Sequence, residues 1–271
     1  MNYNTEKAIL AQTKYKRGFE PPEDAYVISA SMIAKDPLQN YLSILHGTQT
    51  EDVISDSTLG TVFHKGMQVV INDNIREKGI NPDEHILVEH TMHKELKNGW
   101  FLSGTADLII RRTDGTSDIE DHKLTKSYAL KMIKKDLNNH DYTVQLQALD
   151  LLNWNENPYP VEKKLQSTLV INVFCKDAKA IDKEPTFTPV TAPNTELQNF
   201  EERVVEITAS LQAYIEEGEI PPICEDVWLR KLKNGTTIPT KCVLYCSMGK
   251  AGHCPYYKPT TRESVARLTN W

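Results

Sequence analysis

The apolar and polar positions of the chain alternate in some segments and follow a helical period in others. Residues 100–111 and 117–124 read as strands, and they flank the turn signal Thr113-Asp114-Gly115-Thr116, which predicts an antiparallel hairpin. Residues 165–175 are typical of a buried strand, and 182–193 of a proline-bearing extended loop. Helical periodicity predicts three further elements, at residues 59–71, 142–152 and 195–217.

These elements predict an α/β core with a central mixed sheet flanked by helices, followed by a small cysteine-rich module. We expect a flexible N-terminal segment at residues 1–26, a core at 27–220 and a basic cysteine-rich module at 221–271. The chain has 271 residues, of which 39% are hydrophobic, so it is long enough to bury a substantial core.

The hairpin brings two carboxylates together if its register is right. A loop centred on Asp114 aligns Asp107 with Asp121, whereas a strict two-residue loop aligns Asp107 with His122, and we expect the first alignment. Side chains alternate along a strand, so Asp121 and Lys123 share a face and His122 points away. Two carboxylates and an ammonium can hold a divalent cation against a phosphate, although such a short pattern is also common on solvated strand faces.

Two helices can add to this group. His64 lies in an early turn of the helix expected at 59–71, one turn after Gly60, although a single histidine there is more often a half-buried structural residue. Gln145 stands on the otherwise apolar stripe of the helix at 142–152, where a buried amide needs a hydrogen-bonding partner.

Charge is distributed unevenly along the chain. The formal net charge is −6, yet residues 229–271 hold eight lysines and arginines against Glu263 alone. This asymmetry indicates a phosphate-attracting surface on an acidic body. A second basic set follows the proposed site on a short predicted helix, and it is equally consistent with a solvated face: Lys123, Lys126, Lys131, Lys134 and Lys135.

Four of the five cysteines fall in the C-terminal module. Their spacing, C-x17-C-x3-C-x7-C, suits a structural Zn²⁺ or a [4Fe-4S] cluster, and reduced free thiols are the alternative. The fifth, Cys175, belongs to the predicted buried strand and is expected in the core. The candidate ligands are Cys224, Cys242, Cys246 and Cys254.

Taken in order, the motifs GTxxH, GxxD and DxK and the glutamine-bearing helix resemble the RecB-like, phage-exonuclease branch of the PD-(D/E)XK nuclease superfamily. The resemblance covers roughly residues 27–155 and implies a restriction-endonuclease-like core. It implies that His64, Asp107 and Asp121 are metal ligands, that Lys123 acts on the attacking water or the transition state, and that Gln145 contacts the active site or DNA. Carboxylate and imidazole ligands suit Mg²⁺ or Mn²⁺.

Glu89 matches a further acidic position of some members of that family. We give it a tentative place among the ligands, because a turn at Asn98-Gly99 would pair residue 90 with Asp107 and send Glu89 to the opposite face unless the loop is odd in length. The chain also departs from the family pattern. Leu149 replaces a usual tyrosine, Gln68 stands where many relatives carry an acid, and no cysteine precedes Cys175, which favours zinc over the cluster.

The resemblance implies a metal-dependent DNA exonuclease of recombination, repair or phage DNA metabolism. The alternative is a nucleic-acid-binding recombination or assembly partner with this fold and little or no cleavage. The chain has no GxxxxGK[ST] motif, so unwinding would need a partner protein such as a helicase, and an annealing protein is another candidate partner. No apolar run approaches the ~18 residues of a membrane span, and no signal core begins the chain, so we expect a cytoplasmic protein, in the host if it is phage-encoded.

Overall fold

The computed structural model describes residues 21–22, 25–46, 54–138, 140–157, 167–177, 186–225, 229–231, 235, 237–240, 242, 246–250 and 252–257. The side chains of residues 54–59, 230, 247 and 250 are not included. Most of the N-terminal segment expected to be flexible, residues 1–26, lies outside these ranges. The described chain divides into two compact units: unit 1 comprises Met1–Ala34 and Thr58–Thr208, and unit 2 comprises Lys35–Ser57 and Ala209–Trp271.

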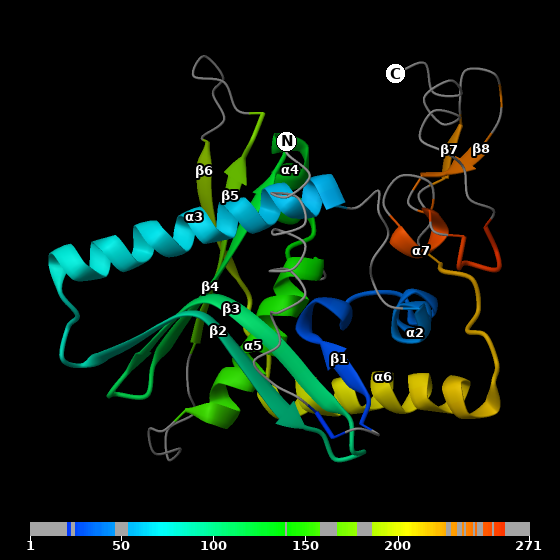
Figure 1. Ribbon diagram of the computed structural model, residues 1–271, viewed down its shortest axis with the longest axis horizontal. Helices are drawn as coiled ribbons and strands as arrows, with labels where there is room; N and C mark the ends of the chain where they lie inside the picture. The colour runs from blue at the N-terminus through cyan, green and yellow to red at the C-terminus, as the bar shows by residue number, and fades with distance from the viewer. Residues whose placement is uncertain are drawn as a thin grey trace, which may run out of the picture. The chain divides into compact units, whose positions relative to one another are not determined.

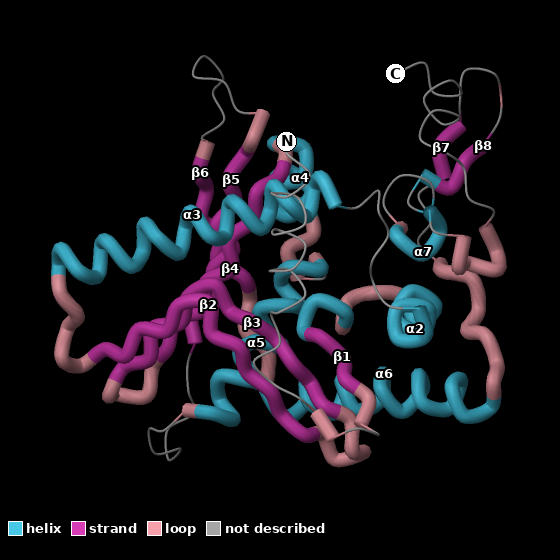
Figure 2. Tube along the Cα trace, viewed as in Figure 1, coloured by secondary structure: helices cyan, strands magenta, loops and turns pink. Residues whose placement is uncertain are grey.

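Unit 1 is built on a six-stranded mixed sheet in the order β1-β3-β4-β5-β6, with β2 paired to β3 (Figures 1 and 2). The β1–β3 and β4–β5 pairs are parallel and the other pairs are antiparallel. The strands are β1 Val27–Ser29, β2 Glu84–Glu95, β3 Phe101–Arg112, β4 Ser117–Thr125, β5 Ser167–Cys175 and β6 Phe187–Ala192. The α/β class with a central mixed sheet flanked by helices is therefore confirmed.

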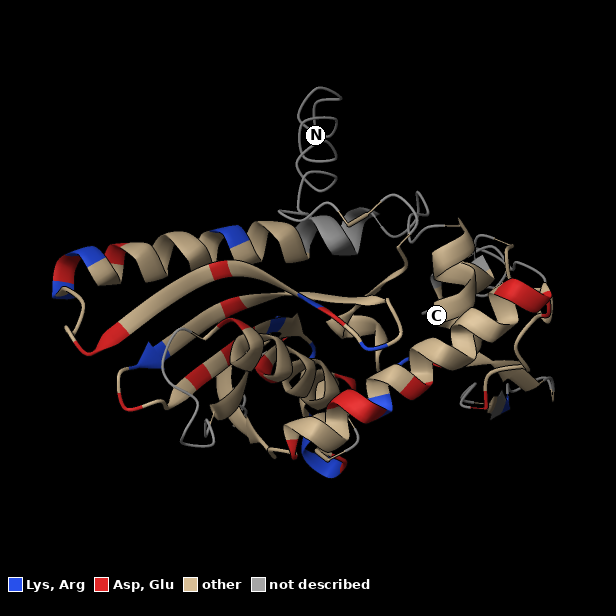
Figure 3. Cartoon of the chain, turned by 90° about the horizontal axis from the view of Figure 1, so that it is seen from below, with Lys and Arg blue, Asp and Glu red and all other residues tan. Residues whose placement is uncertain are grey.

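Helices cover both faces of this sheet. Figure 3 shows α3 along one face of β2 and β3, with α5 on the other side of the sheet. Helix α6 begins in unit 1 and continues into unit 2. The elements of unit 1 besides its strands are η1 Ala30–Met32, α3 Ile54–Lys78 from Thr58 onward, α4 Ser127–Lys135, α5 Asp141–Glu156 and the start of α6 Leu197–Glu217.

Helix α5 is the central helix of unit 1. Every residue from Thr143 to Asn153 is buried except Gln145, because the helix packs against η1 and against strands β2 to β5. Several of its buried polar groups have partners: Thr143 Oγ1 donates to the Leu137 carbonyl at 2.6 Å, and Gln147 Nε2 donates to the Pro193 carbonyl at 3.0 Å. A helix that is buried all round must satisfy its polar side chains in this way.

One segment differs from the sequence expectations and one agrees with them. Residues 187–192, expected as part of a loop, form β6, an edge strand whose Pro189 lies opposite Asn172. Proline is tolerated there because an edge strand can leave one side of its backbone unpaired. The buried strand β5 is confirmed, and Cys175 lies in the core with 2% of its surface exposed.

Unit 2 contains the short C-terminal elements. Strands β7 and β8 form an antiparallel pair, and α2 contacts α7. The imidazole rings of His46 and His253 stack with their centroids 4.2 Å apart. The elements are α2 Pro37–His46, β7 Leu229–Lys231, β8 Thr237–Pro239 and α7 Ser247–Lys250. Within the described part of the chain, no helix is long and apolar enough to cross a bilayer.

Candidate metal centre and active site

The candidate site lies where the sheet is interrupted. One edge of β3 pairs with β2 from Phe101 to Arg112 except at Asp107, for which no partner is assigned. On the other edge, β1 pairs with residues 101–103 and β4 pairs with residues 108–111, so residues 104–107 have no strand beside them there. The pairing of Leu108 with Glu120 extends to place Asp107 opposite Asp121, and the predicted register of this hairpin is confirmed.

Asp107 bridges the interruption with its side chain. Its Oδ2 accepts a hydrogen bond from the His122 backbone N–H at 2.6 Å, in the place of a strand carbonyl. Its Oδ1 lies 3.0 Å from His64 Nδ1. Burial alone would raise the pKa of Asp107, but the hydrogen bonds and charge of His64 and the His122 N–H hold it below the usual range. The carboxylate is therefore ionised and fixed in position.

His64 and Glu89 complete a compact group with Asp107. One potential ligand atom from each of the three residues lies within 4.8 Å of the others. Among the described residues, this is the group of side chains that could hold a metal ion. His64 Nδ1 is 3.8 Å from Glu89 Oε1. The hydrogen bond with Asp107 raises the pKa of His64 above its ordinary value, against the opposing effect of burial. Proton and metal ion would compete for the same imidazole.

Glu89 reaches the group because the β2–β3 loop is odd in length, which was the condition for its tentative place among the ligands. His90 pairs with Ala106, not with Asp107, since the connection is an odd loop closed by hydrogen bonds between Leu96 and Trp100. Glu89 therefore lies opposite Asp107, and its backbone has φ 51°, a left-handed value that is unusual for a residue with a side chain. Local strain of this kind is concentrated at functional sites.

Asp121, Lys123 and Gln145 form a second group, in which Asp121 forms an ion pair with Lys123. Lys123 Nζ lies 2.8 Å from Asp121 Oδ2 and donates to Gln145 Oε1 at 3.1 Å. Gln145 Nε2 donates to Asp121 Oδ1 at 3.2 Å. The ammonium of Lys123 also lies 4.8 Å from the centre of the Tyr142 ring, a cation–π distance.

The protonation of this second group reflects burial and the neighbouring charges. Burial raises the pKa of Asp121, Lys123 opposes the rise and the charge of Asp107 adds to it, so the two groups are electrostatic neighbours. Burial would lower the pKa of Lys123, but Asp121 raises it above its ordinary value. Asp121 was expected among the metal ligands, and the structure places it outside the compact group of His64, Glu89 and Asp107.

Sequence reasoning missed two residues at the site. Tyr142 precedes Gln145 by three positions, a spacing that puts both on one helix face and could have revealed it. His122 was expected to point away from Asp121 and Lys123, yet its buried ring has Nδ1 3.5 Å from Asp107 Oδ2 and Nε2 3.7 Å from Glu120 Oε2. Its ring therefore lies next to the Asp107 oxygen that accepts the hydrogen bond from the His122 N–H.

The cysteines expected to bind a structural metal are not gathered in the structure. Among the described residues, no three of them have sulfur atoms within 4.8 Å of one another. Cys246 Sγ accepts a hydrogen bond of 3.4 Å from the Gly249 N–H. The four residues concerned are Cys224, Cys242, Cys246 and Cys254, all half-buried and none in a disulfide.

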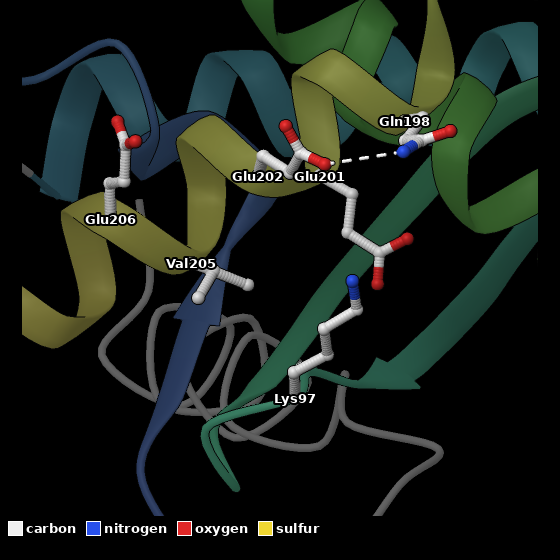
Figure 4. Close-up of a pocket in the computed structure, with 6 residues that line it drawn as sticks. All are labelled: Lys97, Gln198, Glu201, Glu202, Val205 and Glu206. Atoms are coloured by element: carbon white, nitrogen blue, oxygen red, sulfur yellow. Dashed lines mark hydrogen bonds between the residues drawn. The ribbon is translucent and has the colours of Figure 1, made fainter.

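A surface pocket of unit 1 lies between the β2–β3 loop and α6 (Figure 4). Three glutamates and one lysine are among its lining residues, and Gln198 Nε2 donates to Glu202 Oε1 at 3.3 Å. A surface with this charge repels phosphate. None of the residues of the two groups described above lines it: the lining is Lys97, Gln198, Glu201, Glu202, Val205 and Glu206.

The donor set of the compact group fits a hard divalent cation. One imidazole and two carboxylates suit Mg²⁺ or Mn²⁺, which retain several waters and bind phosphate oxygens, whereas softer metals recruit thiolates or more imidazoles. The low pKa of Asp107 supports this assignment, because the ligand is already ionised before a cation arrives.

Comparison with known proteins gives a fold and no family. No family model matches the sequence, and no curated protein matches it. Among solved structures, the crystal structure of SSO0001 is similar, with a TM-score of 0.57 and 15% sequence identity over 94% of this chain and 97% of that chain. At this identity the likeness extends to the fold, and the chain and SSO0001 share it over nearly their whole lengths.

Proposed function

We propose that the protein is a metal-dependent nuclease that hydrolyses phosphodiester bonds in DNA, most simply as an exonuclease. The observation that carries the proposal is the compact group of His64, Glu89 and Asp107 at a break in the sheet, beside the buried ion pair of Asp121 and Lys123. A restriction-endonuclease-like core, with ligands contributed by a helix and by adjacent strands, is consistent with the α/β architecture.

Each residue has a role that follows from its chemistry. His64, Glu89 and Asp107 would hold Mg²⁺ or Mn²⁺, which when bound polarises a phosphate and lowers the pKa of a water molecule. Lys123 supplies a positive charge to the developing oxyanion, and Gln145 orients its ammonium group. We include Asp121 as a further acidic ligand, because a cation bound at Asp107 would attract the Asp121 carboxylate in competition with Lys123.

DNA is the proposed substrate, with a helicase or an annealing protein as the proposed partner in recombination, repair or phage replication inside the cell. The basic residues that follow β4 support an anionic substrate. A DNA-binding protein without cleavage is the second candidate, and one observation favours it: Asp121 is engaged by Lys123 and Gln145 instead of joining the ligand group.

The test is digestion of linear and circular DNA with Mg²⁺, with Mn²⁺ and with EDTA. Loss of linear but not circular DNA, dependent on the metal, supports an exonuclease. Asp107→Asn and Lys123→Ala should each lower the rate by at least about 100-fold, the scale of an essential electrostatic contribution. The matched control is Asp73→Asn, an exposed carboxylate on the same helix as His64. Binding without products from the wild-type protein would support the second candidate.

The structural metal stays a prediction from cysteine spacing. Metal analysis of the untreated protein would detect Zn²⁺, whereas a brown colour and absorbance near ~400 nm after anaerobic purification would indicate a [4Fe-4S] cluster. Finding neither would leave Cys224, Cys242, Cys246 and Cys254 as reduced thiols.

A further inference from the structure

Helix α4 has two faces of opposite character. Leu130 and Ile133 are buried, and the helix packs against β5 through this side. On the opposite side, three and four residues apart, stand Tyr128 with 71% of its surface exposed and Met132 with 38%. Lys131 and Lys135 are exposed on the same side. A ring and two ammonium groups therefore share one solvent-facing stripe.

The charge of this segment is strongly one-sided. Residues 126–136 contain four lysines and a single acidic residue, Asp136 at the end of the helix. Lysines alone are enough to keep a helix face solvated, so the exposed tyrosine and methionine among them need a separate explanation. The combination of cations with an exposed ring is the usual composition of a surface that follows a nucleic-acid backbone and stacks on its bases.

Helix α4 lies between two elements of the candidate site, since it follows β4, which carries Lys123, and precedes α5, which carries Gln145. At its start, Asp177 Oδ1 accepts hydrogen bonds from the Ser127 N–H at 2.7 Å and from Ser127 Oγ at 2.9 Å, two residues after the end of β4. At its other end the chain leads to His140, whose ring centroid is 4.8 Å from that of Tyr142, which in turn neighbours Lys123. The stripe and the site therefore belong to the same compact unit and are joined by short connections.

We propose that the exposed stripe of α4 binds a single-stranded segment of the DNA substrate, with Tyr128 stacked on a base and with Lys131 and Lys135 at phosphates. This inference rests on the proposed nuclease function and adds the form of the substrate. Stacking requires the face of an unpaired base, which a duplex does not offer, whereas lysines alone would bind either form. From Tyr128 to Lys135 the helix rises about 10 Å, enough for a short stretch of strand.

The experiment measures binding of fluorescent oligothymidylate to the full chain by anisotropy in EDTA, across a series of salt concentrations. Tyr128→Ala should weaken binding about 5- to 150-fold, the range for loss of one stacked base. Tyr128→Phe, which keeps the ring, should bind within about twofold of the wild type. Circular dichroism of each variant checks that the fold is retained.

The lysines are tested by the salt dependence. The double change Lys131→Ala and Lys135→Ala should reduce the slope of log K against log salt by about 1.4, since each single-strand phosphate contact contributes about 0.7. The matched control removes two exposed lysines elsewhere in unit 1, Lys78→Ala with Lys97→Ala, and should leave the slope unchanged.

Two results would overturn the inference: Tyr128→Ala binding like the wild type, or duplex binding that falls as much as single-strand binding. The outcome is independent of the digestion assay. If the wild type cuts DNA and Tyr128→Ala binds normally, the stripe is refuted and the nuclease stands. If nothing cuts and Tyr128→Ala still loses single-strand binding, the nuclease is refuted and the stripe stands.

Discussion

Asp150 of α5 tests how burial of a carboxylate affects its pKa and the stability of the fold. Its side chain is 4% exposed and accepts a hydrogen bond from Ser167 Oγ at the start of β5. Burial raises the pKa of Asp150 to about 6, and the bond to Ser167 offsets only part of the rise. The folded state therefore binds a proton more tightly than the unfolded chain does, and the ionised form carries a penalty at neutral pH.

The magnitude follows from the two pKa values. An unfolded aspartate has a pKa of about 3.9, so a folded value of about 6 corresponds to about 3 kcal/mol lost from stability above pH 7. Stability should fall as pH rises between the two pKa values. Within an accessible range, from pH 4.5 to pH 8, the loss due to this group amounts to about 2 kcal/mol.

Asp150→Asn removes the titration and keeps an acceptor for Ser167. We expect the free energy of unfolding of the variant relative to the wild type to rise by about 2 kcal/mol between pH 4.5 and pH 8, whatever constant offset the new amide N–H adds. Urea unfolding at several pH values measures both proteins. Asp73→Asn, an exposed change on α3, reports the effect of removing a surface charge. A difference between wild type and Asp150→Asn that does not vary with pH would refute the reasoning.

Three further predictions concern the site and its packing. Glu89→Gly relieves a left-handed backbone and should stabilise the fold by about 1 kcal/mol in urea unfolding while weakening Mn²⁺ binding, whereas Glu89→Gln should weaken binding without the gain. Gly104→Ala places a methyl group 2.7 Å from Leu149 Cδ2 and 3.0 Å from Ala30 Cβ, so unfolding should become easier by about 1–3 kcal/mol, and an unchanged midpoint would contradict this packing. Mn²⁺ affinity measured by calorimetry should fall as pH falls through the raised pKa of His64, because the protonated imidazole cannot bind a metal; equal affinity at pH 6 and pH 8 would exclude it as a ligand.

The parts of the fold fixed by local chemistry could be predicted from the sequence. The turn at Asp114 determines the β3–β4 register, since Asp114 Oδ1 accepts from the Thr116 N–H at 2.8 Å and closes the loop symmetrically. The buried strand β5 followed from its apolar run. The long helix at 195–217 was also predicted, and it begins at Leu197.

The parts of the fold that depend on contacts between distant residues could not be predicted from the sequence. The β2–β3 loop is odd in length because the buried residues Leu96 and Trp100 close it, and the Asn98-Gly99 signal does not reveal this. The place of Glu89 opposite Asp107 follows from that register. Asp121 pairs with Lys123 at a point where β4 is no longer paired with β3, and a local sequence pattern does not predict where that pairing ends.

The carboxylate of Asp107 belongs at once to the sheet and to the candidate ligand group. One oxygen stands in for a missing strand and satisfies the buried His122 N–H, while the other faces His64. An alanine at this position would remove both functions, leaving a buried donor unpaired at a cost of about 1–3 kcal/mol. The architecture alone therefore limits which residues can replace Asp107, and this constraint would remain in a descendant in which the candidate ligand group had lost any role.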